Sequence, residues 1–424
     1  MHTFSTNHSS TNKSTRKRAI FIFMGSHTFR SALYETVDIT FIRNLFEYRL
    51  VDHSDILVTS IFPKRIPEEK YREITEKEDN LRKLAQNNGI EIQFYHIKSR
   101  TIKDVINASK DINRIATNYD DRFIWAMNYF NCFIGVLIKK QNQETHLHFD
   151  IRGLVPEEEL FYSKSNILFR LVKFMILRIM GRINIKNADS ISVVSRRFKE
   201  YIVKKYNLIS QKVVTIPCFF DQNQFYFDET LRLKFRNKYH IADHQKLIFY
   251  SGTLLKWQEP DLLFSFIKNL QIQDNHQELR FMILTLNQEK ARQYMLKYNI
   301  KDLIIESASG QTLTGLYSAA DIGIAVRSDN LVSYFSSPVK IPEYLGTQNC
   351  LILLECIGDF GLDLKNKKYA LIKKDKKDLL TTNIEEIKGL IKPNTDDLAE
   401  IKNNYSYQNN IELTKRIINQ WNGK

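Results

Sequence analysis

The sequence has few cysteines, no long hydrophobic run and no dense block of basic residues. Its four cysteines fall in no CxxC or Cys/His zinc spacing, a pattern typical of reduced, buried thiols in a cytosolic protein. No stretch of about 18 uncharged apolar residues occurs, so no segment is predicted to cross a membrane as a helix. The first eighteen residues have no apolar core, and we expect a disordered basic tail and no secretory signal.

Acidic residues are outnumbered by basic ones. The 62 Lys and Arg residues against 48 Asp and Glu residues give a formal net charge of +14. Such an excess favours anionic partners, namely nucleic acid, anionic lipid or phosphorylated ligands. Because the basic residues are scattered and no nucleic-acid module is recognisable, we expect no nucleic-acid partner.

Short apolar runs alternate with longer amphipathic segments along the whole chain. This alternation is typical of parallel sheets covered by helices on both faces, and 424 residues suffice for two such domains. In the first half the predicted strands are Ala19–Gly25, Asp55–Phe62, Ile90–Ile97, Arg122–Met127, Thr145–Phe149, Ser190–Ser195 and Lys212–Pro217. In the second half they are Lys246–Gly252, Arg280–Leu286, Leu303–Glu306, Ile322–Val326, Cys350–Leu354 and Tyr369–Ile372.

The predicted fold class is therefore α/β, with two doubly wound, Rossmann-like domains that face each other across a cleft. Ligands of such sheets bind near the carboxyl ends of the strands. The predicted organisation is a tail at 1–18, a first domain at 19–220, a linker at 221–245, a second domain at 246–400 and a C-terminal helix at 401–424 that returns to the first domain.

Two predicted strands end in a glycine turn. The first is Ala19–Gly25, and the second continues into the segment YSGTLLKWQEP, where Gly252 lets the chain turn. Backbone N–H groups and the small side chain of Thr253 would then face the crevice and hold phosphate. An ordinary strand-to-helix turn fits the same residues.

A predicted strand in the second half is bounded by two charged residues. Asp321 precedes the run IGIAV and Arg327 leaves its far end. An arginine at the carboxyl end of a strand in this fold points toward the ligand crevice and can form paired hydrogen bonds to a diphosphate. A solvated arginine is the alternative interpretation.

The segment SSPVKIPEYLG predicts a loop followed by a helix that starts near Val339. Pro342 supports this start, because proline is tolerated only in the first turn of a helix. The free N–H groups of a helix N-terminus, together with Lys340, suit an anionic leaving group, and Glu343 can accept hydrogen bonds from ribose hydroxyls. A capped surface helix with an internal Lys/Glu pair is the alternative.

In the first half, the strand and loop THLHFDIRGLVPEEE contain His146, His148, Asp150 and Arg152 at alternate positions. Their side chains therefore face one side of the sheet as far as the strand persists. Asp150 and Arg152 fall at the carboxyl end, where sites are built, although a structural Asp–Arg pair fits equally well. The histidines have no third metal-type partner nearby, so we expect no metal site.

A helix is predicted from the apolar and basic run NILFRLVKFMILRIMGRI, residues 166–183. Its basic residues occupy about half of the helical wheel and apolar residues the rest. This profile fits a helix that lies on anionic lipid. A helix packed into the core of the α/β domain is the alternative.

In order and spacing, these segments resemble the GT-B fold glycosyltransferases of the group-1, family 4 type, from about Ala19 to Trp421. YSGTLLKWQ resembles the first donor-domain strand and loop, SAADIGIAVR a donor-side strand with an arginine, and SSPVKIPEYLG the nucleotide-sugar helix. FDIRGLVPEEE resembles the interdomain loop of several bacterial polysaccharide members, and SISVVSRRFKEYI and VVTIPCFFDQNQF resemble the stretch before the linker.

The sequence departs from the family pattern at the donor. Many members carry two glutamates separated by seven residues; with Glu343 as the second, Phe335 stands at the first, which often supports the sugar. Thr253 and Gln258 stand where many members have an arginine and a lysine. These departures leave the donor sugar open.

The resemblance implies a retaining reaction in which no metal or other cofactor is bound and the nucleotide-diphosphate sugar is the donor substrate. We assign the phosphate-binding role to Arg327 and Lys340, whose charges would stabilise the diphosphate leaving group. The expected catalytic residues are Asp150, Arg152, Arg327 and Lys340. The expected substrate-binding residues are Gly25, Gly252, Thr253, Trp257, Gln258, Ser337, Pro338, Val339 and Glu343.

The sequence thus predicts a glycosyltransferase that moves a sugar from a nucleotide-diphosphate sugar to a lipid-linked or surface-polysaccharide acceptor. The basic charge and the helix at 166–183 predict a cytoplasmic protein that is peripheral on the inner face of the plasma membrane. Two alternatives stay open. One is a nucleotide-sugar 2-epimerase of the same architecture, and the other is a non-catalytic partner subunit that keeps the fold.

Overall fold

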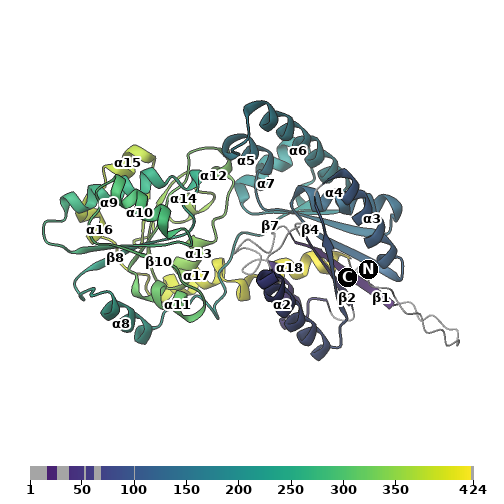
Figure 1. The fold of residues 1–424 in the computed structure, drawn as a ribbon, viewed down its shortest axis with the longest axis horizontal. Helices are drawn as coiled ribbons and strands as arrows, with labels where there is room; N and C mark the ends of the chain where they lie inside the picture. The colour runs from purple at the N-terminus through teal and green to yellow at the C-terminus, as the bar shows by residue number, and fades with distance from the viewer. Residues whose placement is uncertain (1–16, 26–37, 52–53, 62–67, 100, 422–424) are drawn as a thin grey trace. The chain divides into compact units, whose positions relative to one another are not determined.

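The computed structural model describes residues 17–25, 38–51, 54–61, 68–99 and 101–421 (Figure 1). The contacts within the chain divide it into two compact units. Unit 1 contains the described residues up to Phe149 together with Ile183–Asp189. Unit 2 contains Asp150–Arg182 and the described residues from Ser190 onward.

Among the described residues, seven strands form the first sheet in the order β3-β2-β1-β4-β5-β6-β7. They are β1 (Lys17–Met24), β2 (Ser54–Ile61), β3 (Ile92–Ile97), β4 (Tyr119–Met127), β5 (Thr145–Ile151), β6 (Ser190–Val193) and β7 (Val213–Thr215). β1 pairs in parallel with both β2 and β4, so that Phe21 lies opposite Ile56 and Phe123. The aromatic and β-branched residues of β1 are buried because they face helices on both sides of the sheet.

Six strands of unit 2 form the second sheet in the order β10-β9-β8-β11-β12-β13 within the described part of the chain. They are β8 (Lys246–Ser251), β9 (Leu279–Leu284), β10 (Leu303–Glu306), β11 (Ile322–Ala325), β12 (Cys350–Leu354) and β13 (Ala370–Lys373). The strand order reverses between β8 and β11, which pair in parallel. This reversal is the point where doubly wound sheets bind ligands, so the segments that follow β8 and β11 are the first places to look for a site.

The helices connect the strands and cover the sheets. Before the second sheet they are α1 (Thr40–Glu47), α2 (Glu68–Asn87), α3 (Ile102–Ala116), α4 (Asn128–Gln141), α5 (Val155–Tyr162), α6 (Ile167–Asn187), α7 (Arg196–Tyr206) and α8 (Glu229–Lys238). After β8 they are α9 (Pro260–Gln273), α10 (Gln288–Lys297), α11 (Gly310–Ala319), α12 (Leu331–Tyr334), α13 (Lys340–Gly346), α14 (Phe360–Asp363), α15 (Lys376–Leu380), α16 (Ile384–Lys388), α17 (Thr395–Tyr405) and α18 (Tyr407–Trp421). In Figure 1, α9 and α10 lie on one side of the second sheet and α8 and α11 on the other.

The core of the second sheet includes a close contact that requires glycine. Any Cβ at Gly323, in the middle of β11, would clash with the ring of Tyr344 from α13. The absence of a side chain lets that ring lie flat against the strand, and its hydroxyl accepts a hydrogen bond from the backbone N–H of Ser251 at 2.7 Å. The contact holds α13 against the carboxyl ends of β8 and β11.

The predicted α/β architecture of two doubly wound sheets is confirmed, and each predicted strand coincides with an observed one to within a few residues. One local prediction was wrong. The stretch from Val155 to Glu159 was expected to be a loop, but it begins helix α5, with Pro156 in its first turn. Proline, which has no backbone N–H, is well placed there, because the N–H groups of the first turn have no partner within the helix.

Other predictions about organisation stay predictions. Lys17 and Arg18, the last residues of the predicted tail, belong to β1, and the rest of that tail lies outside the described residues. The domain boundaries and the return of the C-terminal helix to the first domain are not tested by the division into units. No helix in the described residues combines the length and the apolar character needed to span a membrane.

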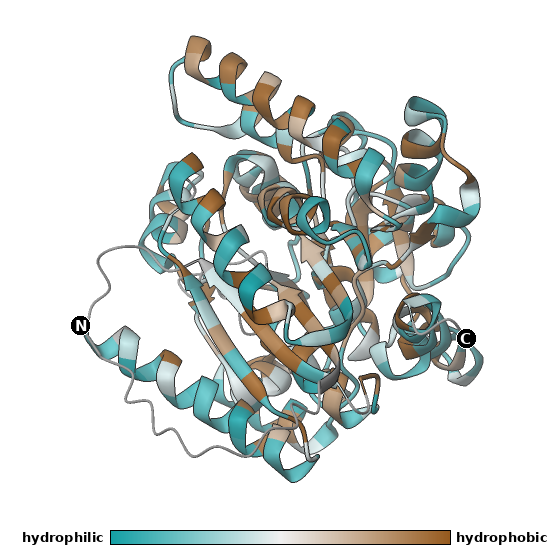
Figure 2. Cartoon of the chain, turned by 90° about the vertical axis from the view of Figure 1, so that its right-hand side faces the viewer, coloured by the Kyte–Doolittle hydropathy of each residue, from teal (hydrophilic) through white to brown (hydrophobic). Residues whose placement is uncertain are grey.

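Helix α6 carries an exposed apolar face, which Figure 2 shows along the helix at the top of the view. The exposed residues of this face are Ile167, Leu168, Phe169, Leu171, Val172, Met175, Ile176 and Ile179. Leu168, Val172, Met175 and Ile179 follow one another at intervals of four and three residues, so they form one stripe along the helix. The interpretation of this segment as a core-packed helix is therefore wrong for this face, because the side chains that a core would bury are in solvent.

Candidate active site

Arg327 lies just past the carboxyl end of β11 and is partly buried. Its neighbour Ser328 fixes the backbone here: the Ser328 N–H donates to the carbonyl of Trp257 at 3.0 Å, and its hydroxyl donates to Glu259 at 2.6 Å. The guanidinium forms no hydrogen bond or ion pair with any residue that the structure describes. Burial lowers the pKa of Arg327, and the nearby Tyr250 and Glu158 oppose that effect. An arginine held this way stays charged and has donors to spare for an anion.

The loop after β8 is held by its own side chains. Gly252 adopts φ 158°, and a Cβ there would come within 3.1 Å of the Tyr250 hydroxyl. That hydroxyl is within hydrogen-bond distance of the Thr253 carbonyl, at 2.6 Å, and of the Gln258 amide oxygen. The Gln258 amide donates in turn to the Thr253 hydroxyl at 3.1 Å. Thr253 and Gln258, which the sequence assigned to substrate, therefore shape the loop that presents Gly252.

Trp257 belongs to the short 3₁₀ helix η3 (Lys256–Gln258) in the same loop. Its ring lies 5.6 Å from the ring of Tyr162 at the end of α5. The Tyr162 hydroxyl accepts a hydrogen bond of 2.5 Å from Asn330, three residues after Arg327. These contacts connect α5 to the segments that follow β8 and β11, and nothing in the sequence pattern indicated Tyr162 or Asn330.

Helix α13 starts at Lys340 with Val339 as its N-cap residue, as predicted. Glu343 is 3% exposed, and its Oε2 accepts hydrogen bonds from the Tyr317 hydroxyl at 2.7 Å and from Lys340 at 2.8 Å. The internal Lys/Glu pair that the alternative interpretation named is thus present. The second carboxylate oxygen of Glu343, Oε1, has no hydrogen bond to a described residue and can accept one from a ligand. Because Glu343 already neutralises Lys340, Arg327 is the stronger of the two cations for binding an anion.

The loop before α13 is tied to the segment after β7. The Ser337 hydroxyl oxygen accepts a hydrogen bond of 3.0 Å from the Cys218 N–H, which leaves the hydroxyl proton of Ser337 to donate elsewhere. Pro338, the next residue, is buried. Burial raises the pKa of Cys218, and the charges of Arg152 and Arg327 act in the opposite direction. The charges of Arg152, predicted from the first half of the chain, and of Arg327, predicted from the second, thus both act on Cys218.

Asp150 and Arg152 form the pair that the sequence left open. Asp150, at the end of β5, is 2% exposed, and its two oxygens accept from Arg152 at 2.9 Å and from the Ser192 hydroxyl at 2.8 Å. The carboxylate is therefore committed to orienting Arg152. The structure favours a positioning role for Asp150, and the catalytic role of Arg152 stays a prediction.

Glu158, in α5, is a residue that the sequence analysis missed. Its carboxylate is partly buried and forms no hydrogen bond or ion pair with a described residue. Burial raises the pKa of Glu158, and the charge of Arg327 works against that rise. The sequence offered no signal, because Glu158 is the middle residue of a run of three glutamates.

Gly25 belongs to unit 1, at the end of β1. Its N–H donates to the Thr59 carbonyl at 3.2 Å, and its own carbonyl accepts from the Asn131 amide at 2.5 Å. A Cβ there would lie 2.5 Å from a carboxylate oxygen of Asp38, so only glycine fits. This predicted substrate-binding residue is well defined within unit 1, and the other predicted site residues lie in unit 2.

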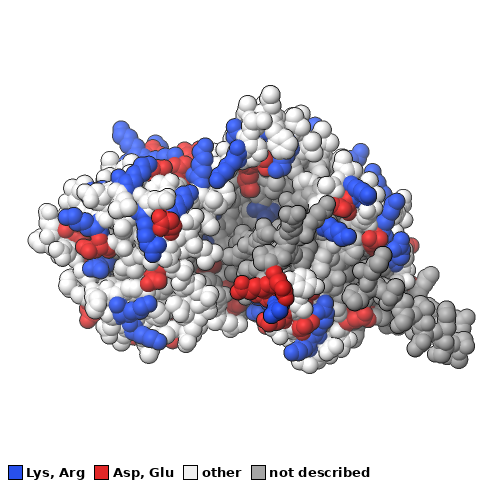
Figure 3. All heavy atoms as spheres, viewed as in Figure 1, with Lys and Arg blue, Asp and Glu red and all other residues white. Residues whose placement is uncertain are grey.

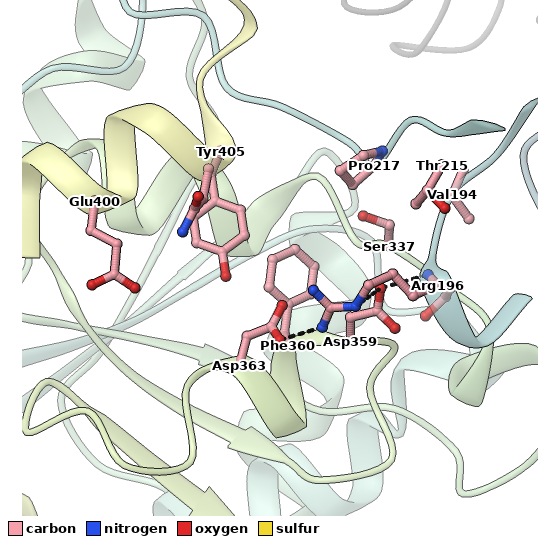
Figure 4. A pocket seen from close by; sticks show the side chains of 12 residues that line it. Val194, Arg196, Thr215, Pro217, Ser337, Asp359, Phe360, Asp363, Glu400 and Tyr405 are labelled. Atoms are coloured by element: carbon pink, nitrogen blue, oxygen red, sulfur yellow. Dashed lines mark hydrogen bonds and ion pairs between the residues drawn. The ribbon is translucent and has the colours of Figure 1, made fainter. Parts of the chain in front are cut away.

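A cavity of about 390 Å³ in unit 2 has a different character (Figure 4). Its lining consists of Val194, Arg196, Thr215, Pro217, Ser336, Ser337, Asp359, Phe360, Asp363, Glu400, Asn404 and Tyr405. Arg196 is paired with Asp363 and lies 3.6 Å from Asp359, and Glu400 adds a further carboxylate. Its arginine is paired and three carboxylates line it, so the cavity is a poor site for a diphosphate. Of the predicted site residues, it contains only Ser337.

The two histidines of β5 are packed against aromatic rings. His146 lies 5.1 Å from Phe123 in a stacked arrangement, and His148 is buried 4.2 Å from Trp125. Burial lowers the pKa of His146 and outweighs the opposing charge of Asp189. Within the described ranges, no group of three or more His, Cys, Asp or Glu residues is placed to hold a metal ion.

The two doubly wound parallel sheets define a class of fold, the two-domain GT-B architecture. No protein-family model matches the sequence, and no curated protein matches it either. Solved structures do match. Anabaena HepE in complex with UDP and glucose superimposes with a TM-score of 0.67 at 10% identity, covering 96% of this chain and 100% of the other.

Two further solved structures show the same architecture. A glycosyltransferase from Rickettsia africae has a TM-score of 0.64 at 13% identity, covering 95% of this chain and 98% of the other. WaaG, a glycosyltransferase involved in lipopolysaccharide biosynthesis, has a TM-score of 0.59 at 12% identity, with 96% and 100% covered. At such low identity the likeness shows the shared GT-B fold over nearly the whole chain.

Proposed function

We propose that this chain is a glycosyltransferase that moves a sugar from a nucleotide-diphosphate sugar to a lipid-linked or surface-polysaccharide acceptor. The observation that carries the proposal is the partly buried, unpaired Arg327 at the reversal point of the second sheet. An uncompensated charge there is costly unless an anion completes it. The complexes of HepE with UDP and with UDP-glucose support a nucleotide-sugar donor in this architecture.

The other residues have consistent roles in this proposal. Arg327 binds the diphosphate, and Lys340, although paired with Glu343, keeps N–H donors for a second contact with phosphate. Glu343 offers its free Oε1 to the ribose hydroxyls, while the Ser337 hydroxyl and the backbone at Gly252 donate to phosphate or sugar. As the bond to the sugar breaks, negative charge grows on the departing diphosphate, and fixed cations stabilise it most at that moment. The proposed reaction is retaining and needs no metal.

The test is donor binding. Purified protein is titrated with UDP-, GDP-, ADP- and dTDP-sugars, with and without magnesium, and its thermal unfolding is followed. We expect one nucleotide class to raise the unfolding temperature without magnesium, and the Arg327→Ala, Lys340→Ala double variant to lose that rise. Full donor affinity in the double variant would refute the phosphate assignment.

The same experiment separates the alternatives. Folded protein that binds no donor points to a non-catalytic partner subunit. Isomerisation or hydrolysis of the donor in the absence of any acceptor points to a 2-epimerase. Transfer to an added lipid-linked or glycan acceptor, with the sugar configuration read by nuclear magnetic resonance, supports the proposal and decides between retention and inversion.

We further propose that the acceptor is reached at an anionic membrane surface to which α6 binds. Within α6, Arg170, Lys173, Arg178, Arg182 and Lys186 are basic and no residue is acidic. The exposed apolar stripe of the first turns continues into the exposed Arg182 and Lys186. An apolar face bordered by cations matches the interface of a bilayer that carries anionic lipid. The proposed location is the cytoplasmic side, where the four unpaired thiols stay reduced.

A matched pair of variants tests this surface. Leu168 in α6 and Leu296 in α10 are both 74% exposed, so their replacement removes the same solvated apolar area. On the face that Figure 3 draws, Lys and Arg are interspersed with Asp and Glu. The variants therefore replace an apolar residue and leave the basic residues in place. We expect Leu168→Ser to weaken co-sedimentation with phosphatidylglycerol vesicles and Leu296→Ser to leave it unchanged. Equal binding to neutral and anionic vesicles, or equal effects of both variants, would exclude the surface.

A further inference from the structure

The three consecutive glutamates of α5 have three different environments. Glu157 is buried and lies 3.9 Å from Arg178. Glu159 forms an ion pair of 2.7 Å with Lys173. The carboxylate of Glu158, between them, forms no hydrogen bond and no ion pair with any residue in the described part of the chain. The carboxylates of Glu157 and Glu159 both reach basic residues of α6. The side chain of Glu158 leaves the helix about 100° from each of them and has no such contact.

The direction of Glu158 is defined by its neighbours. One carboxylate oxygen lies 2.6 Å from the position that a Cβ on Gly153 would occupy, so the side chain rests against the chain just after Arg152. Tyr162, one helical turn after Glu158, accepts a hydrogen bond of 2.5 Å from Asn330, three residues after Arg327, so this part of α5 lies beside the segment that follows β11. The charge of Arg327 accordingly acts against the rise in the pKa of Glu158, although the two groups form no ion pair. Each is partly buried, and each keeps its hydrogen-bonding capacity for a third partner.

The chemistry of that partner follows from the pair. A carboxylate close to an arginine that binds phosphate is unfavourable to the anion unless it also accepts a hydrogen bond from it. In a nucleotide-diphosphate sugar, the groups next to the outer phosphate that can donate are the hydroxyls of the sugar, a few bonds away. A bare nucleoside diphosphate has no such hydroxyl at that end.

The position that the family pattern gives to a sugar-supporting carboxylate cannot supply one here. Phe335 stands there, and its ring is buried in a stack with Tyr201 at 4.7 Å and Phe198 at 5.4 Å. Its carbonyl accepts a hydrogen bond of 3.0 Å from the Ser195 hydroxyl. Phe335 therefore works as a packing residue between α7 and α12.

We propose that Glu158 is a sugar-binding residue, whose carboxylate accepts a hydrogen bond from a hydroxyl of the sugar attached to the diphosphate that Arg327 holds. The inference rests on the proposed function, because it requires a nucleotide-diphosphate sugar at Arg327. It adds a contact from α5 to the donor, where the substrate-binding residues expected from the sequence came from other segments. It also makes the donor sugar one with a free hydroxyl close to the anomeric carbon.

The test compares two ligands on five proteins. Affinities for the nucleoside diphosphate and for its sugar derivative, in the nucleotide class found by the donor screen, are measured by calorimetry. The proteins are the wild type, Glu158→Gln, Glu158→Ala, Glu159→Gln and Arg327→Ala. The quantity of interest is the ratio of the two affinities. Removing the negative charge of Glu158 strengthens the binding of the nucleoside diphosphate more than that of its sugar derivative, because the free terminal phosphate carries more negative charge. Glu158→Gln and Glu158→Ala remove the same charge, so the difference between their ratios reports the hydrogen bond to the sugar.

We expect the ratio for Glu158→Ala to fall about tenfold below that for Glu158→Gln, the size of a lost hydrogen bond, because the glutamine amide oxygen can still accept one. Glu159→Gln should leave the ratio unchanged. Equal ratios in the two Glu158 variants overturn the inference while the proposed function stands. If Arg327→Ala weakens neither ligand, the proposed function itself fails.

Discussion

The two ends of strand β11 carry charged residues in opposite situations. At its amino end, Asp321 accepts hydrogen bonds from Arg232 at 2.6 Å, from Arg236 at 2.9 Å and from the Leu247 N–H at 2.9 Å. At its carboxyl end, Arg327 has no partner among the described residues. The strand between them is only four residues long, and all four are buried.

The difference separates a charge that serves the fold from one that awaits a ligand. Asp321 closes a network that joins α8, β8 and β11, and removing it would leave two arginines uncompensated. Arg327 is held by the backbone around it, through Ser328, and its guanidinium forms no ion pair with a described residue. In a doubly wound sheet this is the expected polarity, since ligands bind at the carboxyl ends of the strands.

The largest expected effect is on the amino end. Asp321→Asn should lower the free energy of unfolding of unit 2 by about 3–5 kcal/mol, because a buried ion network loses its only anion. Urea unfolding followed by circular dichroism measures this. Asp329→Asn, which changes an exposed aspartate two residues after Arg327, should stay within about 0.5 kcal/mol of the wild type. A loss below about 1 kcal/mol would mean that the network is not structural.

The same network should make stability depend on acid. Although burial raises the pKa of Asp321, the charge of Arg232, the Leu247 N–H and the remaining cations lower it overall. The stabilisation is therefore complete above the unfolded pKa, about 3.9, and is lost as the pH falls through the lower folded value. The gap in unfolding free energy between wild type and Asp321→Asn should shrink below about pH 4 and be constant near neutrality. A gap that widens in acid contradicts this sign.

The carboxyl end should respond in the opposite direction. Arg327→Met replaces an unpaired, partly buried charge by an apolar side chain of similar length, and we expect stability to rise by about 1 kcal/mol while donor affinity falls. Urea unfolding and donor titration on the same preparation give both numbers. If Arg327→Met destabilises the protein as Asp321→Asn does, then Arg327 has a structural partner and the contrast between the two ends disappears.

The smallest expected effect concerns the support of Arg327. The Ser328 hydroxyl donates to Glu259, so Ser328→Ala should cost about 1 kcal/mol of stability and weaken donor binding slightly. Ser333 is the matched control, because its buried hydroxyl oxygen has no hydrogen-bond partner. Ser333→Ala should be neutral in both measurements. Equal losses in the two variants would show that the Ser328 bond does not hold the arginine in place.

Much of the second sheet could be predicted from the sequence. The strands Leu303–Glu306 and Cys350–Leu354 have the predicted bounds, because short runs of buried apolar residues between helices leave few alternatives. The start of α13 was also predicted, since proline restricts where Lys340–Gly346 can begin. Helix α5 was missed because its residues, VPEEELFY, show no apolar periodicity that marks one buried face.

The site was predicted only in part, because the sequence shows where strands end but does not show which side chains pair. Strand ends and glycine turns are visible in a sequence, and they indicated Gly252 and Arg327. Whether a charged side chain is paired depends on residues far away in the chain. Lys340 and Glu343 form an ion pair, and Thr253 and Gln258 form a hydrogen bond within their loop. Asp150 accepts a hydrogen bond that orients Arg152.

By itself, the sequence determined the class of fold and the places where a site can be built. Hydrophobic alternation specifies strands and helices locally, and the order of those elements specifies doubly wound sheets. Only the tertiary structure decided which polar groups are satisfied and which are not. Arg327 and Glu158 are distinguished from Arg236 and Glu159 by their neighbours alone, because hydrogen bonds and ion pairs join residues that are remote in sequence.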